Sequence, residues 1–479
     1  MSSSNDTQKV NNNSTPAAAT PSTTGSSGSG GVHSNIADKI HEYKCKSETS
    51  PMNTVKDLVM PVDEYRPAGY HLKMMQVITR HGRRTPESNR YPLSLWSCNS
   101  VDNLIVNKDA NRPECNLGQL TVFGTRDLIN LGKNYHRMLI DKVHFLSDEY
   151  KPDEIFVRSS DRERTISSAR SLMHGLYGGA FADAQEHMLN AATSFVILPE
   201  AVENIYPRGS CPRYAFLKSI LPKHPKVLEE QKNSKLEDFS QRLRDIFEAS
   251  KGYDSPFYVP SWRSYAGLVN SFDCFKNHGL PLPEGFNDEI VERMYLEASK
   301  EYKRMSLFPE MQRLGIGRFI GDLNKQLKSK ATNQENTKDL KFGLYSAHDS
   351  TLGALLVAYD MYEENTHPET ASALEFLLFE KDQNNNKKVE DSKQQQLATE
   401  NAGKPTTNQQ QQQFVKVIYN QKPVHIKKCK EFEVDEMCPY EKFIEISQEL
   451  IPKDWNQECK ISEAEKKSII EEMKASPKY

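Results

Sequence analysis

Short apolar runs alternate with helical patterns in the first half of the chain. The run at 74–78 and those at 154–158 and 196–198 have the length and composition of buried strands. Between them, apolar residues recur every three to five positions over 120–139 and 166–176, which predicts helices with one buried face. This alternation is typical of an α/β fold, in which ligands bind at the carboxyl ends of the strands.

The middle of the chain has a helical pattern, and strand-like runs resume after it. Helical periodicity occupies 207–330, and apolar runs return at 342–346, 373–380 and 414–419. We therefore expect an α/β domain made of residues 70–206 and 331–450, with a mainly helical domain inserted at 207–330.

Three stretches lack a pattern of buried positions. Residues 1–34 are rich in Ser, Thr, Asn, Gly and Ala and are predicted to be disordered. Residues 381–413 are rich in Asn, Gln and Lys, which predicts a disordered, solvated loop. Residues 451–479 form a C-terminal tail, predicted to be a charged surface helix beyond Ile461.

Composition narrows the class of protein. The charges nearly balance, with 62 basic and 65 acidic side chains, which argues against a general partner of nucleic acid or membrane surfaces. The first residues show no secretory signal, and no apolar run approaches the length of a membrane span. The eight cysteines lack C-x-x-C spacing, which argues against zinc. A cytoplasmic protein with free thiols is favoured, although Cys429 and Cys438 flank a short loop and could pair.

The strongest chemical signal follows the first strand, in Arg80-His81-Gly82-Arg83-Arg84-Thr85-Pro86. Several guanidinium groups around one imidazole are costly unless an anion joins them. A guanidinium matches a pair of phosphate oxygens with two parallel hydrogen bonds. The segment therefore predicts a phosphate site with a histidine in its floor, and the alternative is a basic surface loop without a ligand. The unpatterned stretch 91–115 is predicted to be a long loop at its mouth.

The segment 80–86 resembles the R-H-G-x-R-x-P signature of the histidine acid phosphatases, the second branch of the histidine phosphatase superfamily. His348-Asp349, after the run 342–346, resembles that family's distal H-D pair. The resemblance extends from about residue 72 to about 450. It implies a mixed, mostly parallel sheet flanked by helices, as in phosphoglycerate mutases, and an inserted helical domain that helps to shape the substrate pocket. It also favours pairing of Cys429 with Cys438.

The resemblance implies a role for each motif residue. His81 is the nucleophile, which forms a phosphohistidine, and Asp349 donates the proton to the leaving alkoxide. The neighbouring guanidiniums lower the pKa of the imidazole, and a bound phosphate raises that of the carboxyl. The phosphoryl group is bound by Arg80, Arg84, Arg158 and His348.

Arg158 is chosen because 158–165 resembles the family's R-S-T-D-x-x-R-T segment, with Ser160 where Thr is usual. The alternative is that Arg158 forms an ordinary ion pair with Asp161 or Glu154. Arg83 stands at the variable position of the signature, so its role stays open. Two further arginines are interpreted as solvated helix charges, Arg162 and Arg164.

These residues predict an acid phosphatase that hydrolyses phosphate monoesters and requires no metal or other cofactor. One alternative is a catalytically inactive phosphoester-binding module. Another is a sugar-phosphate phosphotransferase, although the distal G-H-G of mutases does not follow Ser346. The expected partner is a small phosphomonoester, either a lysophospholipid or a sugar phosphate, and not a nucleic acid. Few extra basic residues lie nearby in sequence, which ranks inositol hexakisphosphate low; they are Arg90, Lys108 and Arg112. The oligomeric state stays open.

Overall fold

The computed structural model describes residues 61–87, 115–178, 195–249, 264–279, 285–363, 367–382 and 412–475. The predicted disorder at 1–34 lies outside these ranges, as do nearly all of the tract 381–413 and of the loop 91–115. None of the described helices has both the length and the apolar character needed to cross a bilayer.

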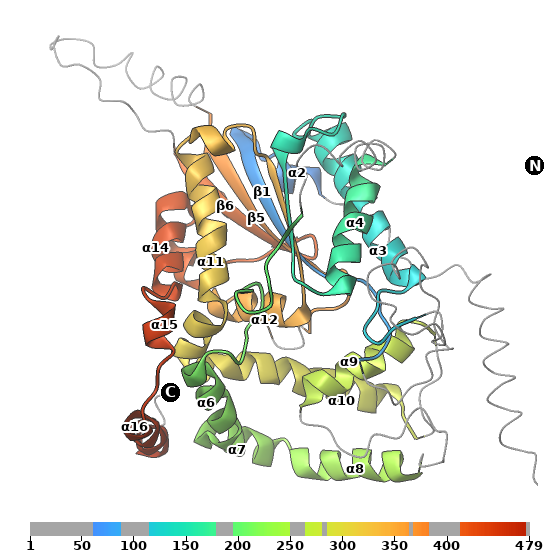
Figure 1. Ribbon diagram of the computed structural model, residues 1–479, viewed down its shortest axis with the longest axis vertical. Coiled ribbons are helices and arrows are strands. Elements are labelled where there is room, and N and C mark those ends of the chain that lie inside the picture. Colours follow the sequence, from blue (N-terminus) through green and yellow to red (C-terminus); the bar gives the residue numbers. More distant parts are fainter. Residues whose placement is uncertain are drawn as a thin grey trace, which may run out of the picture. The chain divides into compact units, whose positions relative to one another are not determined.

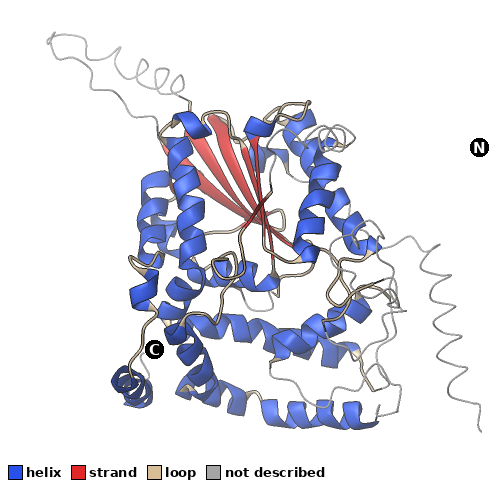
Figure 2. Ribbon diagram, viewed as in Figure 1, coloured by secondary structure: helices blue, strands red, loops and turns tan. Residues whose placement is uncertain are grey.

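A mixed sheet forms the centre of the fold (Figure 2), as the family resemblance implied. It is not mostly parallel, because three of the pairings between the described strands are parallel and four are antiparallel. The strand order is β3-β2-β4-β1-β5-β6-β7, and β8 pairs with β6. The first four strands of this order are parallel, and β1 is the junction because it pairs in the antiparallel sense with β5. The strands are β1 (Tyr70–Arg80), β2 (Ile155–Ser159), β3 (Val196–Ile197), β4 (Phe342–Ala347), β5 (Ala373–Lys381), β6 (Gln413–Tyr419), β7 (Lys422–Pro423) and β8 (Cys438–Pro439).

Helices cover both faces of this sheet because consecutive strand residues point to opposite sides. Met75 and Val77 of β1 belong to a core shared with α3 (Val122–Tyr135) and α4 (Glu163–Tyr177). Met74 and Ile78 belong to a second core on the other face, shared with α11 (Pro309–Ala331), α12 (Asp349–Ala358) and α14 (Tyr440–Leu450). Figure 1 shows these two helical layers on either side of the strands. A short helix, α2 (Val62–Tyr65), precedes β1, and a π-helix, His136–Lys142, continues α3.

Every element described between 207 and 330 is helical. The helices α8 (Leu236–Ala249), α9 (Tyr265–Lys276) and α10 (Asp288–Lys303) enclose a small core of their own. Two others, α6 (Pro212–Ile220) and α7 (Pro225–Asn233), lie before them. Short 3-10 turns occur at Pro152–Glu154, Leu221–Lys223, Arg304–Leu307, Glu335–Thr337 and Lys427–Phe432.

Disulfides correct the expectation of free thiols. Cys429 and Cys438 are bonded, as the family resemblance favoured, and Cys211 is bonded to Cys459, 248 residues away. Cys115 is also disulfide-bonded. Disulfides persist in oxidising compartments, so the expectation of a cytoplasmic protein loses its basis in the cysteines. The Cys211–Cys459 bridge joins the start of α6 to the C-terminal tail, which is helical as expected, with α15 (Trp455–Glu458) and α16 (Glu463–Ala475).

Candidate active site

Strand register brings the sequence motifs together. Arg80, the last residue of β1, lies opposite Ala347, the last residue of β4, so His81 and His348 leave the sheet side by side. The backbone N–H of His81 donates to the carbonyl of Ala347 at 3.0 Å. Gly82 then passes so close to α3 that a Cβ on it would lie 2.4 Å from the Gly124 carbonyl oxygen. Only glycine fits this approach, which fixes the turn after the histidine.

The two imidazoles are buried and face each other edge to face, with ring centroids 5.7 Å apart. His81 Nδ1 lies 2.8 Å from the carbonyl oxygen of Gly82. Because a carbonyl can only accept, Nδ1 carries the proton and Nε2 keeps a free lone pair. His348 Nε2 lies 2.9 Å from the hydroxyl of Ser160, the serine that replaces the family's usual threonine. The contact with the Gly82 carbonyl thus gives His81 the tautomer that a nucleophilic imidazole needs.

Burial and neighbouring cations keep both imidazoles neutral. The pKa of His81 is lowered well below 6.5, first by burial and then by Arg164, Arg80 and Arg84. The pKa of His348 is lowered to about 3 by the same two causes. At mildly acidic pH the site therefore contains uncharged rings within a positively charged wall.

The guanidinium groups of Arg80 and Arg84 are almost fully buried, yet each keeps a donor free. Arg80 donates to the Pro368 carbonyl at 2.5 Å and to Asn270 Oδ1 at 2.7 Å. Arg84 donates to the Thr85 carbonyl at 2.9 Å. The Nε–H groups of both arginines are buried and have no hydrogen-bond partner among the described residues. Such unmet donors are costly, but Arg158, away from the site, has one as well, so the case for an anion rests on the convergence of guanidinium groups around His81.

Asp349 begins α12, and His348 is the N-cap residue of that helix. Oδ2 of Asp349 accepts hydrogen bonds from Asn270 Nδ2 at 2.8 Å and from the Tyr302 hydroxyl at 3.0 Å. Oδ1 of Asp349 accepts one from the Ser350 N–H at 2.8 Å. Burial alone would raise the pKa of Asp349. The guanidinium of Arg80 and the hydrogen bond from Asn270 outweigh burial, and they lower this pKa well below its usual value.

Comparison with known proteins agrees with this geometry. A family model described as the histidine phosphatase superfamily, branch 2, matches residues 71–420. The chain belongs to this family. It is 57% identical to a probable acid phosphatase of Dictyostelium discoideum over 86% of this chain and 84% of the relative. It is 26% identical to human lysosomal acid phosphatase over 85% of this chain and 83% of that protein. The chain is therefore a histidine-type acid phosphatase.

A solved structure supports the fold. The apo form of a Hafnia alvei phytase superposes with a TM-score of 0.55, and the match covers 83% of this chain and all of that one at 12% identity. At this identity the similarity concerns the arrangement of the sheet and helices alone.

Of the predicted phosphate-binding arginines, Arg158 is not brought to His81. Strand alternation places Arg158 on the same face of the sheet as its register partner Tyr345, toward α11. There its guanidinium donates to Asp322 at 2.8 Å and to Glu203 at 2.7 Å and lies over the ring of Phe319. Arg158 therefore forms ion pairs, as in the alternative considered from the sequence, but its partners are Glu203 and Asp322 and not Asp161 or Glu154.

Arg164, interpreted from the sequence as a solvated charge, is drawn into the site instead. Its side chain is 15% exposed, and among the cations it has the largest effect on the pKa of His81. Its guanidinium lies 2.7 Å from a carboxylate oxygen of Glu87, whose other oxygen is 3.7 Å from Arg84. The guanidiniums of Arg84 and Arg164 thus converge on one small anionic group. The sequence signal was the second arginine of the R-S-T-D-x-x-R-T segment.

Arg83 has a different task from its neighbours in the signature. It forms two hydrogen bonds to the carboxylate of Asp127 on α3, at 2.6 and 2.7 Å, and a third to the carbonyl of Asn277, beyond the end of α9. It therefore fastens the helical segment to the α/β body.

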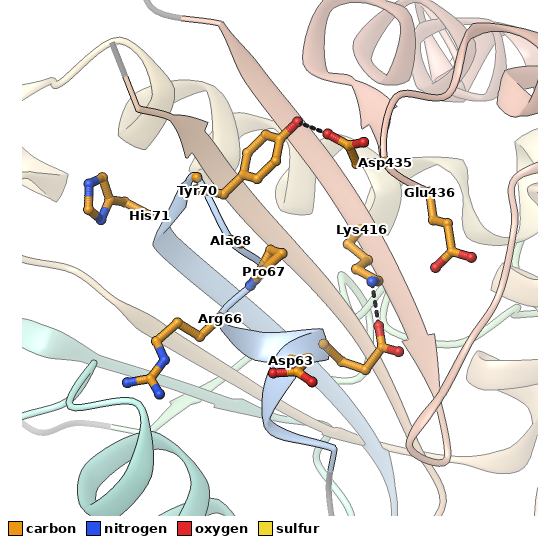
Figure 3. A pocket seen from close by; sticks show the side chains of 11 residues that line it. Asp63, Arg66, Pro67, Ala68, Tyr70, His71, Lys416, Asp435 and Glu436 are labelled. Atoms are coloured by element: carbon orange, nitrogen blue, oxygen red, sulfur yellow. Dashed lines mark hydrogen bonds and ion pairs between the residues drawn. The ribbon is translucent and has the colours of Figure 1, made fainter. Parts of the chain in front are cut away.

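A hollow of about 810 Å³ lies beside the start of β1, at the other end of this strand from His81 (Figure 3). It contains carboxylates and cations that are already paired, such as Glu64 with Lys416, and the Tyr70 hydroxyl donates to Asp435. None of the predicted site residues lines it, so size alone does not mark the active site here. Among the described residues, no three His, Cys, Asp or Glu side chains are gathered so as to hold a metal ion.

Proposed function

We propose that this acid phosphatase hydrolyses small phosphate monoesters through a phosphohistidine on His81, without a metal ion. One observation carries the proposal. The Nδ1 proton of His81 is committed to the Gly82 carbonyl, which leaves Nε2 as a neutral nucleophile among guanidinium groups.

The guanidinium groups perform two functions in this mechanism. Arg80, Arg84 and Arg164 bind the phosphoryl oxygens and offset the negative charge that would repel an attacking lone pair. They also keep His81 unprotonated by raising the cost of a further positive charge. His348 supports the phosphoryl group from the neighbouring strand end, with its Nε2 held beside Ser160.

Asp349 is the proton donor in the first step. The bond between phosphorus and the ester oxygen breaks as His81 Nε2 bonds to phosphorus, and the leaving oxygen takes the proton of Asp349. Water then attacks the phosphohistidine, gives a proton back to Asp349, and phosphate is released. The protein's own groups favour the carboxylate, so the negative charge of the bound ester must supply the rise in the pKa of Asp349.

The rim of the site supports a substrate with a single phosphate group. Tyr206 lies edge-on to His348, and beyond it Arg208 lies over the Tyr206 ring. Both Arg208 and Arg162 form ion pairs with Glu200, and this exposed carboxylate would repel a second phosphate at this part of the rim. We therefore keep a lysophospholipid or a sugar phosphate as the substrate class and rank polyphosphorylated inositols below them.

The test uses purified enzyme with p-nitrophenyl phosphate and with glycerol phosphate, across acidic and neutral pH. Activity should be greatest at acidic pH and should survive a chelator. His81→Ala should lower turnover by at least about 10⁴-fold while leaving the thermal unfolding temperature unchanged. Loss of activity on chelation, or binding of phosphoesters without turnover, would contradict the proposal.

A further inference from the structure

Asn270 links the helical segment to the reacting groups. It lies on α9, and its amide bridges Arg80 and Asp349. Arg80 Nη2 donates to Asn270 Oδ1 at 2.7 Å, and Asn270 Nδ2 donates to Asp349 Oδ2 at 2.8 Å. The same side chain thus holds a phosphate-binding guanidinium and the proposed proton donor in one chain of hydrogen bonds.

Tyr302, on α10, adds a second contact from the helical segment. Its hydroxyl donates to Asp349 Oδ2 at 3.0 Å, and its side chain is buried. A carboxylate oxygen has two acceptor positions, so Asn270 and Tyr302 together fill those of Oδ2. Oδ1 accepts one bond, from the backbone N–H of Ser350, and within the described part of the chain its second acceptor position is open. The two oxygens of Asp349 are therefore not equivalent.

We propose that Asn270 and Tyr302 are positioning residues that reserve Oδ1 of Asp349 for the catalytic proton and make Asp349 a stronger acid toward the leaving group. This inference rests on the proposed role of Asp349. When the Oδ1–H bond breaks, the proton goes to the leaving oxygen and the electron pair stays on the carboxylate. The two hydrogen bonds to Oδ2 stabilise that new negative charge and so assist the transfer.

Other titratable groups also face Asp349, and their contributions must be separated from these two hydrogen bonds. Arg80 and His81 come from the end of β1, Arg164 from α4, and His348 precedes Asp349 itself. Two more groups follow α12, Tyr362 and His367. All of these groups are kept in the two test variants, Tyr302→Phe and Asn270→Ala, so a change in either can be assigned to the hydrogen bonds on Oδ2. The control variant, Tyr362→Phe, removes only the Tyr362 hydroxyl.

The test variant is Tyr302→Phe, which keeps the ring and removes one donor. The measurement is the single-turnover rate at saturating glycerol phosphate as a function of pH, which reports Asp349 in the substrate complex. Without the donor, Asp349 keeps its proton to higher pH, so the alkaline limb of the rate profile should shift to higher pH by about one unit. As a weaker acid, it should also lower the plateau rate several-fold, while p-nitrophenyl phosphate, whose leaving group needs little protonation, is hardly affected.

Tyr362→Phe is the matched control. Its ring lies 6.2 Å from that of Tyr302, but its hydroxyl bonds to Ser299 at 3.2 Å. It should leave the pH profile in place. A second variant, Asn270→Ala, should move the alkaline limb in the same direction and should also weaken inhibition by inorganic phosphate, because Arg80 loses an orienting partner.

The inference is overturned if Tyr302→Phe matches the control, or if it slows both substrates equally without moving the pH limb. Asp349→Asn separates this failure from a failure of the proposed function. If Asp349→Asn discriminates strongly between the two substrates while Tyr302→Phe does not shift the profile, only the positioning role is wrong. If Asp349→Asn slows both substrates alike, the proton-donor role itself is wrong.

Discussion

Two carboxylates of this protein, Asp349 and Glu375, have pKa values that are shifted in opposite directions. Glu375 lies in the middle of β5 and is 1% exposed. Its Oε2 accepts a hydrogen bond from the Tyr65 hydroxyl and its Oε1 one from the Tyr135 hydroxyl, both at 2.6 Å. Burial raises the pKa of Glu375 to about 7, against the partial opposing effect of the two tyrosines. Asp349 also accepts a tyrosine hydroxyl, yet its pKa is held far below the usual value.

The difference shows which contacts decide the charge of a carboxyl group in this protein. Desolvation acts on both groups in the same direction. Hydroxyl donors temper it at Glu375, but they do not reverse it. At Asp349 the guanidinium of Arg80 and the hydrogen bond from Asn270 reverse it. Glu375 is thus a structural group that links Tyr65 before β1 and Tyr135 of α3 to the sheet. Asp349 is held charged, and in the proposed mechanism it takes up a proton only when a phosphate ester binds.

The largest expected effect comes from removing a cation from the site. Arg164→Ala should lower kcat/KM for p-nitrophenyl phosphate by about 10³-fold, because a guanidinium that offsets charge on the phosphoryl group is lost. Arg162→Ala, in the same turn but 43% exposed, is the control and should have little effect. Steady-state kinetics of the two variants check this.

Arg158→Ala completes that comparison. It should change kcat/KM by less than about tenfold, because its guanidinium pairs with Glu203 and Asp322 and not with the phosphoryl site. It should lower the free energy of unfolding by about 3–5 kcal/mol, since the fully buried Glu203 loses its cation. A larger catalytic loss in Arg158→Ala than in Arg164→Ala would restore the assignment made from the sequence.

Asp349→Asn should act on the proton-transfer step alone. With glycerol phosphate, whose leaving oxygen needs a proton, the rate should fall by about 10²–10³-fold. With p-nitrophenyl phosphate the loss should be under about tenfold, because that anion leaves without help. Rates for a series of esters with different leaving-group pKa values measure the contrast directly. A uniform loss along the series would remove Asp349 from the role of general acid.

The smallest effect, and one confined to stability, is expected at Glu375. Its pKa is higher in the folded protein, about 7, than the usual 4.5, so the folded state retains a proton that the unfolded chain has lost. The contribution of Glu375 to the free energy of unfolding is largest below pH 4.5, declines as the pH rises toward 7, and no longer changes above pH 7. Glu375→Gln cannot titrate, so between these limits the wild type should lose about 3 kcal/mol relative to the variant.

Urea unfolding of both proteins across this pH range checks the prediction. The comparison below pH 4.5 serves as the internal control, because both side chains are then uncharged in both states. If the free energies of unfolding of the two proteins differ by the same amount at every pH, the pKa of Glu375 is not raised on folding, and its contrast with Asp349 fails.

The sequence predicted the parts of the site that follow directly from strand order. His81, His348 and Asp349 meet because each follows a strand-like apolar run, and those runs are neighbouring parallel strands that end in register. The choice between Arg158 and Arg164 failed for a physical reason. It depends on which face of the sheet residue 158 points to, and on Asp322, which lies 164 residues away and supplies its partner.

The contacts from the helical segment carried no local signal. Asn270 and Tyr302 lie on helices whose apolar patterns describe their own packing and not what their polar faces touch. The disulfide between Cys211 and Cys459 joins positions 248 residues apart, and their spacing alone indicates no pairing. Long-range partners of this kind require the folded chain.

Identification of the phosphorylated residue tests the mechanism most directly. The enzyme should be mixed with p-nitrophenyl phosphate, quenched at alkaline pH, where phosphohistidine persists, and digested for mass spectrometry. We expect one phosphoryl group on His81 in the wild type, and none in His81→Ala. A phosphoryl group on another residue, or label that persists in His81→Ala, would contradict the account.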